Sequence, residues 1–275
     1  MSTNTEIETT NTSNKNGKQK LETQEQNTAP NLSQNEVNII IESWLRIFNV
    51  KLGWIHDFDK IVTKYIKYFK LLKILQGHDD GVRNVQFSSD GCEIVSSSND
   101  KTVRVWNVAS GKQMHIFERH FDAIRFAEFS PDDQMTMSSS DDNTIILWSL
   151  KSGEKLKELK GHSDSIIDSK FSPDSQFVVS CSRDKTIRIW DVYAGKEVKK
   201  LEGHSDIVYE VKYFPDGQAV VSCSEDKTVR LWDVKTGYEM QRLEGHFSGV
   251  PGVDVSPDGD IIVSCSYDKT IRIWG

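Results

Sequence analysis

The stretch Val179–Asp191 reads Val-Ser-Cys-Ser-Arg-Asp-Lys-Thr-Ile-Arg-Ile-Trp-Asp, and close copies of it recur along the chain at intervals of 42 residues. The tryptophans of the copies are Trp106, Trp148, Trp190, Trp232 and Trp274. A histidine and an aspartate keep the same spacing in all five copies. A fixed period of about 40–45 residues indicates a repeat architecture in which each copy is one supersecondary unit.

Each copy predicts several short strands. In the third copy the predicted strands are 165–171, 177–182, 186–192 and 197–202. Turns that contain Pro, Asp or Gly separate these β-branched runs, a pattern typical of antiparallel hairpins. Four strands in one copy predict one blade of an all-β propeller.

The copies resemble the WD-repeat β-propeller family. The resemblance is carried by a Gly-His pair, a Phe-Ser-Pro-Asp turn and the run Ser-Cys-Ser-x-Asp-Lys-Thr-Ile-Arg-Ile-Trp-Asp, and it covers residues 77–275. It implies a non-catalytic scaffold for protein–protein interaction. Members of the family serve in ubiquitin-ligase adaptors, chromatin complexes, signalling and trafficking, and the sequence does not choose among these roles.

Four residues of each copy are expected to form a hydrogen-bonded tetrad. A carboxylate that holds an imidazole, which contacts a hydroxyl and then an indole N–H, satisfies every buried polar group and ties strands together. The tetrads are His78, Ser96, Asp100 and Trp106; His120, Ser138, Asp142 and Trp148; His162, Ser180, Asp184 and Trp190; His204, Ser222, Asp226 and Trp232; and His246, Ser264, Asp268 and Trp274.

A hydrolase triad is an alternative for Ser, His and Asp, but no copy carries a GxSxG elbow, and a catalyst needs one constellation rather than five. We therefore expect no enzyme activity.

Binding specificity is expected at positions that vary between copies. One set lies five residues after each histidine and the other lies just before each turn aspartate. The candidates are Arg83, Arg125, Ile167, Tyr209 and Pro251, and Asn99, Asp141, Arg183, Glu225 and Tyr267. The resemblance implies that these residues ring the mouth of the central channel, where peptides dock. The arginines suit a carboxylate or phosphate and the tyrosines suit an apolar contact, which favours an acidic or phosphorylated peptide. Sequence drift at exposed sites is the other reading of the same variation.

Composition narrows the function classes. The formal net charge of −7 argues against a general nucleic-acid binder. No run of about 18 apolar residues and no secretory signal is present, so we expect an intracellular protein in the cytoplasm or nucleus. Four cysteines without a CxxC pair argue against a ribbon-type zinc site, and we expect no metal or cofactor. Cys181, Cys223 and Cys265 are expected to be small buried hydrophobes.

The first 76 residues divide into further segments. Residues 1–35 are polar and predict a disordered tail. Residues 36–70 carry apolar residues at helical spacing and predict a helical hairpin that packs on the next domain. Lys60, Lys64, Lys67, Lys70 and Lys73 offer an alternative, in which this basic hairpin docks to a membrane surface or a partner and the propeller is a passive platform.

Blade closure is the remaining question. The copies are 77–118, 119–160, 161–202, 203–244 and 245–275, and the last one stops at the end of its third predicted strand. Residues 71–76 are expected to supply the missing strand and close a ring of five blades, which would remove an exposed edge. The competing reading is a chain whose ring is completed by an absent segment.

Overall fold

Nineteen short strands make up the part of the chain that the computed structural model describes, residues 71–275. The tail 1–35 and the helical hairpin 36–70 expected from the sequence lie outside the described residues. Within residues 71–275 no helix is long and apolar enough to cross a bilayer. The all-β repeat fold is confirmed.

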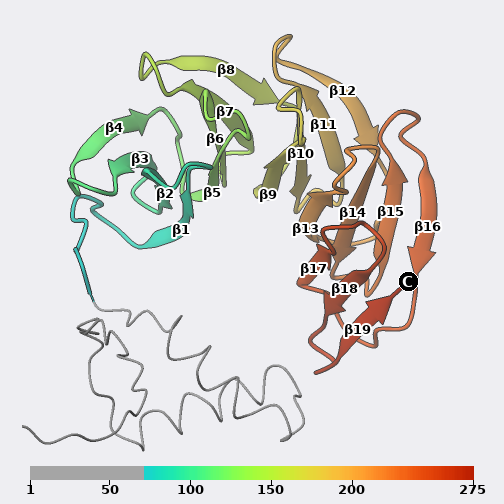
Figure 1. Cartoon of the computed structure of the whole chain (residues 1–275). Coiled ribbons are helices and arrows are strands. Elements are labelled where there is room, and N and C mark those ends of the chain that lie inside the picture. Colours follow the sequence, from blue (N-terminus) through green and yellow to red (C-terminus); the bar gives the residue numbers. More distant parts are fainter. Residues whose placement is uncertain (1–70) are drawn as a thin grey trace, which may run out of the picture. The chain divides into compact units, whose positions relative to one another are not determined.

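The strands form one antiparallel sheet for each copy of the repeat, with neighbours paired in chain order (Figure 1). The first sheet contains β1 (Val82–Phe87), β2 (Glu93–Ser98), β3 (Thr102–Asn107) and β4 (Gln113–Glu118). The second contains β5 (Ile124–Phe129), β6 (Met135–Ser140), β7 (Thr144–Ser149) and β8 (Lys155–Lys160). The third contains β9 (Ile166–Phe171), β10 (Phe177–Ser182), β11 (Ile187–Asp191) and β12 (Lys196–Leu201). The fourth contains β13 (Val208–Tyr213), β14 (Ala219–Ser224), β15 (Val229–Asp233) and β16 (Glu239–Leu243), and the fifth contains β17 (Gly252–Val255), β18 (Ile262–Cys265) and β19 (Ile271–Trp274).

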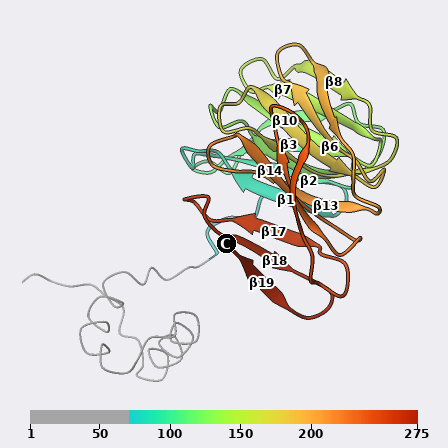
Figure 2. The same cartoon turned by 90° about the vertical axis from the view of Figure 1, so that its right-hand side faces the viewer.

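The sheets stand side by side like blades, with the first strand of each sheet innermost (Figures 1 and 2). Neighbouring inner strands contact one another in the order β1, β5, β9, β13 and β17. Buried apolar side chains fill each junction between sheets. At the third junction Ile189 and Leu201 of the third sheet meet Val211 and Trp232 of the fourth. Burial of such side chains contributes roughly 1.5–3 kcal/mol each, so the junctions hold the blades together.

The strand expected over residues 71–76 is not formed, and the fifth sheet has three strands. The segment instead follows the turn between β3 and β4, where the Lys73 ammonium donates to the carbonyl oxygen of Val108 at 3.0 Å. A Cβ placed on Gly111 would lie 3.1 Å from Cδ of Lys73, and a Cβ on Gly195 would meet Cδ of Lys157, a residue of β8, at 2.9 Å. The segment thus takes the place of an outer strand beside the first sheet, but β19 does not pair with it.

The two terminal faces of this row of sheets are open. Val85 of β1 is 63% exposed and Ile273 of β19 is 73% exposed. Their counterparts at the internal junctions, Val211 and Ile189, are buried. The exposed faces therefore present apolar side chains at positions that the third junction covers.

Cys265 corrects one expectation, because it is exposed while Cys181 and Cys223 are buried. Cys181 and Cys223 belong to the apolar clusters of the third and fourth junctions, so the equivalent Cys265 lies on the open face of the fifth sheet. All four cysteines are free thiols, and Cys92 is exposed as well.

We expect two of the four thiols to react with a thiol reagent in the native protein, Cys92 and Cys265. A hydrogen bond to Asp90 and the charge of that residue raise the pKa of Cys92, so this thiol reacts more slowly. Stopped-flow labelling should show two phases, and Cys265→Ser should remove the faster one. A native protein in which Cys92 alone reacts would mean that the fifth sheet is covered in solution.

Candidate functional site

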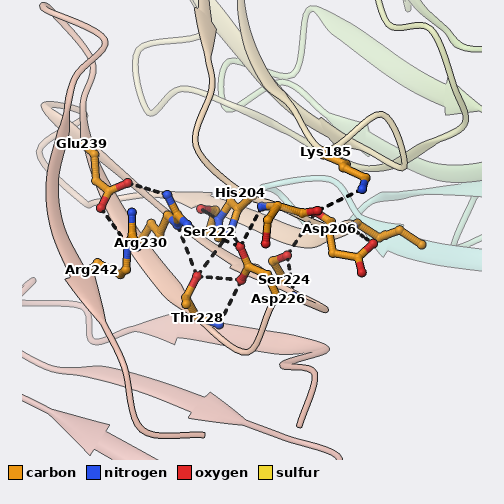
Figure 3. A network of polar contacts seen from close by, with 12 residues as sticks. Lys185, His204, Asp206, Ser222, Ser224, Asp226, Thr228, Arg230, Glu239 and Arg242 are labelled. Atoms are coloured by element: carbon orange, nitrogen blue, oxygen red, sulfur yellow. Dashed lines mark hydrogen bonds and ion pairs between the residues drawn. The ribbon is translucent and has the colours of Figure 1, made fainter. Parts of the chain in front are cut away.

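The polar network at the start of the fourth sheet shows how the tetrad residues lie (Figure 3). His204 precedes β13, Ser222 lies in β14, Asp226 lies in the turn that follows, and Trp232 lies in β15. Nδ1 of His204 lies 2.8 Å from Oδ2 of Asp226, and Nε2 lies 2.8 Å from Oγ of Ser222. The indole N–H of Trp232 donates to the same Oγ at 2.8 Å. One chain of hydrogen bonds thus joins the loop, the two strands and the turn.

The other four sheets bring their tetrad residues together in the same way. Their histidine–aspartate distances are 2.8–2.9 Å and their histidine–serine distances are 2.8–2.9 Å. The serine also accepts the indole N–H at 2.8–2.9 Å in each. Every tetrad serine is buried, and its oxygen is already occupied by these contacts. A nucleophilic serine needs an accessible oxygen, so the geometry suits a framework role.

A threonine joins every tetrad and was missing from the expectation. Thr228 Oγ1 donates to Oδ1 of Asp226 at 2.6 Å, and its backbone N–H donates to the same oxygen at 3.0 Å. The equivalent residues are Thr102, Thr144, Thr186 and Thr270. The signal was present in the sequence, because a threonine follows each turn aspartate by two residues in all five copies.

The pKa of the aspartate is lowered in every tetrad, and in the third and fourth tetrads the pKa of the histidine is lowered as well. Burial of Asp100 opposes ionisation, but hydrogen bonds from Thr102, the backbone of Asp79 and His78 outweigh it and lower the pKa of Asp100 to about 2. Burial lowers the pKa of His162 and of His204, and the neighbouring aspartates only partly offset this effect. Neutral imidazole donates to the carboxylate through Nδ1 and accepts from serine through Nε2.

The two sets of variable positions contact each other within single sheets. Nε of Arg83 donates to Oδ1 of Asn99 at 2.6 Å, and Arg125 forms an ion pair with Asp141. The hydroxyl of Tyr209 donates to Glu225 at 3.0 Å. Each pair joins the start of an inner strand to the turn sixteen residues later. The guanidinium groups of Arg83 and Arg125 therefore already have partners of their own.

The third and fifth sheets differ from this pattern. Within residues 71–275 no side-chain hydrogen bond or ion pair joins Ile167 to Arg183 or Pro251 to Tyr267. Arg183 is exposed and Tyr267 is 59% exposed. The ring of Tyr267 meets that of Tyr209 edge to face, with centroids 6.4 Å apart. Among the candidate residues of the third to fifth sheets, Arg183 is thus a cation without a partner in the described part of the chain, and Tyr209 and Tyr267 form an aromatic pair.

Two exposed aromatic residues were missed. Phe121 is 82% exposed and Phe247 is 81% exposed, and each directly follows a tetrad histidine. The equivalent residues of the other copies are Asp79, Ser163 and Ser205. A bulky apolar residue at a position that is otherwise small or polar is the signal that would have found them.

A belt of charged side chains runs along the inner strands. Lys170 lies 3.5 Å from a carboxylate oxygen of Glu128 and 3.5 Å from one of Asp168. Glu128 also accepts the backbone N–H of Phe171 at 2.6 Å. Burial raises the pKa of Glu128 to about 7, and the charge of Asp168 adds to this effect while Lys170 opposes it. Glu128 is thus a buried acid on the inner strand β5.

Glu128→Gln is expected to stabilise the protein at high pH. Because the pKa is raised in the folded state, the folded protein keeps this proton while the unfolded chain loses it, and stability falls as the pH rises from about 4.5 to 7. Glutamine carries no charge to bury, so the variant should gain about 2 kcal/mol over the parent at pH 8 and close to nothing at pH 4.5. Urea unfolding at both pH values measures the difference. A gain of the same size at both would show that the charge of Glu128 is not the cause.

Comparison with known proteins agrees with this framework. The family model described as WD domain, G-beta repeat matches residues 69–107, 111–149, 153–191, 195–233 and 237–275, well over half of the chain. The chain is 35% identical over 57 residues to dynein assembly factor with WD repeat domains 1 of Xenopus laevis, across 21% of this chain and 14% of the relative. It is 51% identical over 39 residues to lissencephaly-1 homolog 1 of Paramecium tetraurelia, across 14% of this chain and 10% of the relative. It is 45% identical over 59 residues to vegetative incompatibility protein HET-E-1 of Podospora anserina, across 22% of this chain and 4% of the relative.

The matched segments therefore span only a small part of each relative's length. The evidence for the family is the repeat itself, since each of the five matched segments contains the first three strands of one antiparallel sheet and one complete hydrogen-bonded tetrad. This chain belongs to the WD-repeat family of β-propeller proteins.

Proposed function

We propose that the protein is a non-catalytic scaffold that docks a partner peptide on the surface formed by Arg183, Tyr209, Phe247 and Tyr267, named here the rim surface. Interaction scaffolding is the general role of WD-repeat proteins. The observation that carries the proposal is the contrast between a constant framework and this variable group of side chains, of which Arg183, Phe247 and Tyr267 are exposed. The tetrads are the same in every sheet, whereas an exposed cation and exposed aromatics occur together on the third to fifth sheets.

The chemistry of the rim surface favours an acidic or phosphorylated peptide. Arg183 has no partner among the described residues, so its guanidinium is available for a bidentate contact with a carboxylate or phosphate. Tyr267 and Phe247 supply rigid apolar area of the kind that dominates binding energy at interfaces. A protein partner in the cytoplasm or nucleus, rather than a nucleic acid, fits this surface and the formal charge of −7.

The experiment is quantitative affinity capture with the full chain as bait. The double variant Arg183→Glu, Tyr267→Ala should retain a specific partner at least tenfold less than the parent, because it reverses the unpaired cation and removes the aromatic contact. The matched control is Lys196→Glu, Tyr193→Ala, which makes the same chemical changes at exposed positions near the other end of β11. Both variants should keep their free energy of unfolding within about 0.5 kcal/mol of the parent.

Two results would contradict the rim surface as the docking site. One is a partner that the control variant loses, and the other is a partner that both variants retain equally well.

A further inference from the structure

The first and fifth sheets each carry an exposed apolar face at one end of the row of sheets. The first-sheet face is defined by exposed residues of β1: Val82, Val85 and Phe87. The fifth-sheet face is defined by exposed residues of β18 and β19: Val263, Cys265, Ile271 and Ile273. Groups of exposed apolar side chains mark interaction sites on soluble proteins. Neither face includes a residue of the rim surface.

The repeat identifies these faces as the two halves of one internal junction. The residues equivalent to Val82 in the other four sheets are all fully buried: Ile124, Ile166, Val208 and Val250. The residues equivalent to Ile271 are fully buried as well: Val103, Ile145, Ile187 and Val229. At all four internal junctions the equivalent of Ile271 shares an apolar cluster with the equivalent of Val82 in the next sheet. The surface that fits the fifth-sheet face is therefore one like the first-sheet face.

A polar contact between inner strands accompanies the apolar cluster. Glu128 of β5 accepts the backbone N–H of Phe171 of β9 at 2.6 Å. The residue equivalent to Glu128 in the fifth sheet is Asp254, whose side chain is exposed. The residue equivalent to Phe171 in the first sheet is Phe87. A first-sheet face docked on a fifth-sheet face would therefore also bring a backbone N–H to a carboxylate, a favourable charge-assisted contact.

The segment 71–76 provides the outer strand of such a junction. Cδ2 of Leu75 lies 3.5 Å from a Cβ placed on Gly111, as Cδ2 of Leu201 of β12 lies 3.4 Å from a Cβ placed on the equivalent glycine of the fourth sheet. The segment thus lies against the first sheet as β12 lies against the fourth. β12 pairs with β11, and the equivalent strand β19 pairs with β18 alone within residues 71–275. On docking, the segment would run along the open edge of β19, and open strand edges favour such pairing.

A second copy covers these faces more easily than the chain's own opposite end. Within one chain the two faces lie apart, since Val82 is 55% exposed and Ile271 is 76% exposed. Four junctions of buried apolar side chains set the positions of the sheets between them. Closely packed interiors resist deformation, so bringing the two ends together would disturb these contacts. Docking on a second copy leaves all four junctions unchanged.

We propose that the protein associates head to tail, with the fifth-sheet face of one copy docked on the first-sheet face of a second copy. The contact repeats the internal junction: Ile271 packs on Val82, Asp254 accepts from the backbone of Phe87, and the segment 71–76 extends the fifth sheet. Such an interface is heterologous, because its two sides are different surfaces of the same chain. A copy with one face blocked can therefore still dock through the other.

Two single variants block one face each. Ile271→Lys places a charge on the fifth-sheet face, and Val82→Lys places one on the first-sheet face. A charge that docking would bury without a partner opposes the contact. Both residues are exposed in the single copy, so both variants should fold and keep the circular-dichroism spectrum of the parent. The matched control is Leu156→Lys, which makes the same kind of change at an exposed position of the second sheet.

Sedimentation velocity of the full-length chains measures the association. The parent and the control should form species larger than a monomer in proportions that rise with concentration, whereas each single variant alone should sediment as a monomer. An equimolar mixture of Ile271→Lys and Val82→Lys should form a dimer of one copy of each and nothing larger, because one pair of intact faces remains.

Thiol labelling of the same mixture reports which face is covered. Cys265 of the Val82→Lys chain should react more slowly once Ile271→Lys is added, because its fifth-sheet face is then docked. Cys92 of the same chain should keep its rate.

Three results would each overturn the proposal. One is a parent that stays monomeric at every concentration. The second is association of either single variant to the same extent as the parent, which would place the contact elsewhere on the chain. The third is a mixture of the two single variants that remains monomeric, because unlike faces would then not pair.

Discussion

Replacing Asp226 with alanine is expected to lower the free energy of unfolding by about 3 kcal/mol. Asp226 accepts from the ring of His204, from the backbone of Ser205 at 3.0 Å and from Thr228, and it faces Arg230 at 3.5 Å. These contacts lower its pKa despite burial, which means that the folded state depends on its charge. Without the carboxylate, several buried donors have no acceptor (Figure 3).

Equilibrium urea unfolding followed by tryptophan fluorescence measures the loss. The control is Glu202→Ala, which removes an exposed partner of Lys200 and should cost less than about 0.5 kcal/mol. Equal losses for the two variants would show that the tetrad does not stabilise the fold.

Replacing Leu147 with alanine is also expected to lower the free energy of unfolding by about 3 kcal/mol. Leu147 lies in β7 with no exposed surface and belongs to the cluster between the second and third sheets. Truncation removes its buried methyl groups and leaves a cavity against Phe171 and Val178.

The matched control lies in the same sheet. Leu156 is in β8 and is 45% exposed, so Leu156→Ala should cost less than about 1 kcal/mol. The two variants differ only in the burial of the leucine. If the exposed position proved as costly as the buried one, the junctions between sheets would not be the main apolar core.

The strands of this protein were predictable because their signals are local. The prediction 177–182 coincides with β10, and 165–171 and 197–202 differ from β9 and β12 by single residues at their ends. Alternating β-branched residues and turn residues act within a few positions of each other, so a short window of sequence contains them. The 42-residue period then repeats the result for every copy.

Closure of the ring was not predictable in the same way. Residues 71–76 have the composition of an outer strand, but whether they pair with β19 depends on contacts between the two ends of a row of sheets. A short stretch of sequence does not predict a contact between two distant parts of the chain. The open terminal faces and the exposure of Cys265 therefore follow from the structure and not from the sequence pattern.

The candidate site was predictable in part. The variable positions were found by comparing copies, but their mutual contacts, such as Arg125 with Asp141, depend on the register of two strands. These contacts leave Arg183 as the unpaired arginine of the candidate set and move the expected surface from the first two sheets to the last three.

The most direct test of the scaffold proposal is site-specific photo-cross-linking in cell lysate. A photoreactive phenylalanine analogue replaces the exposed Tyr267 on the rim surface or the exposed Tyr193 on the turn between β11 and β12. The proposed docking site predicts a cross-linked protein partner from position 267 and none from position 193. Cross-linking from position 193 alone, or with equal yield from both positions, would contradict it.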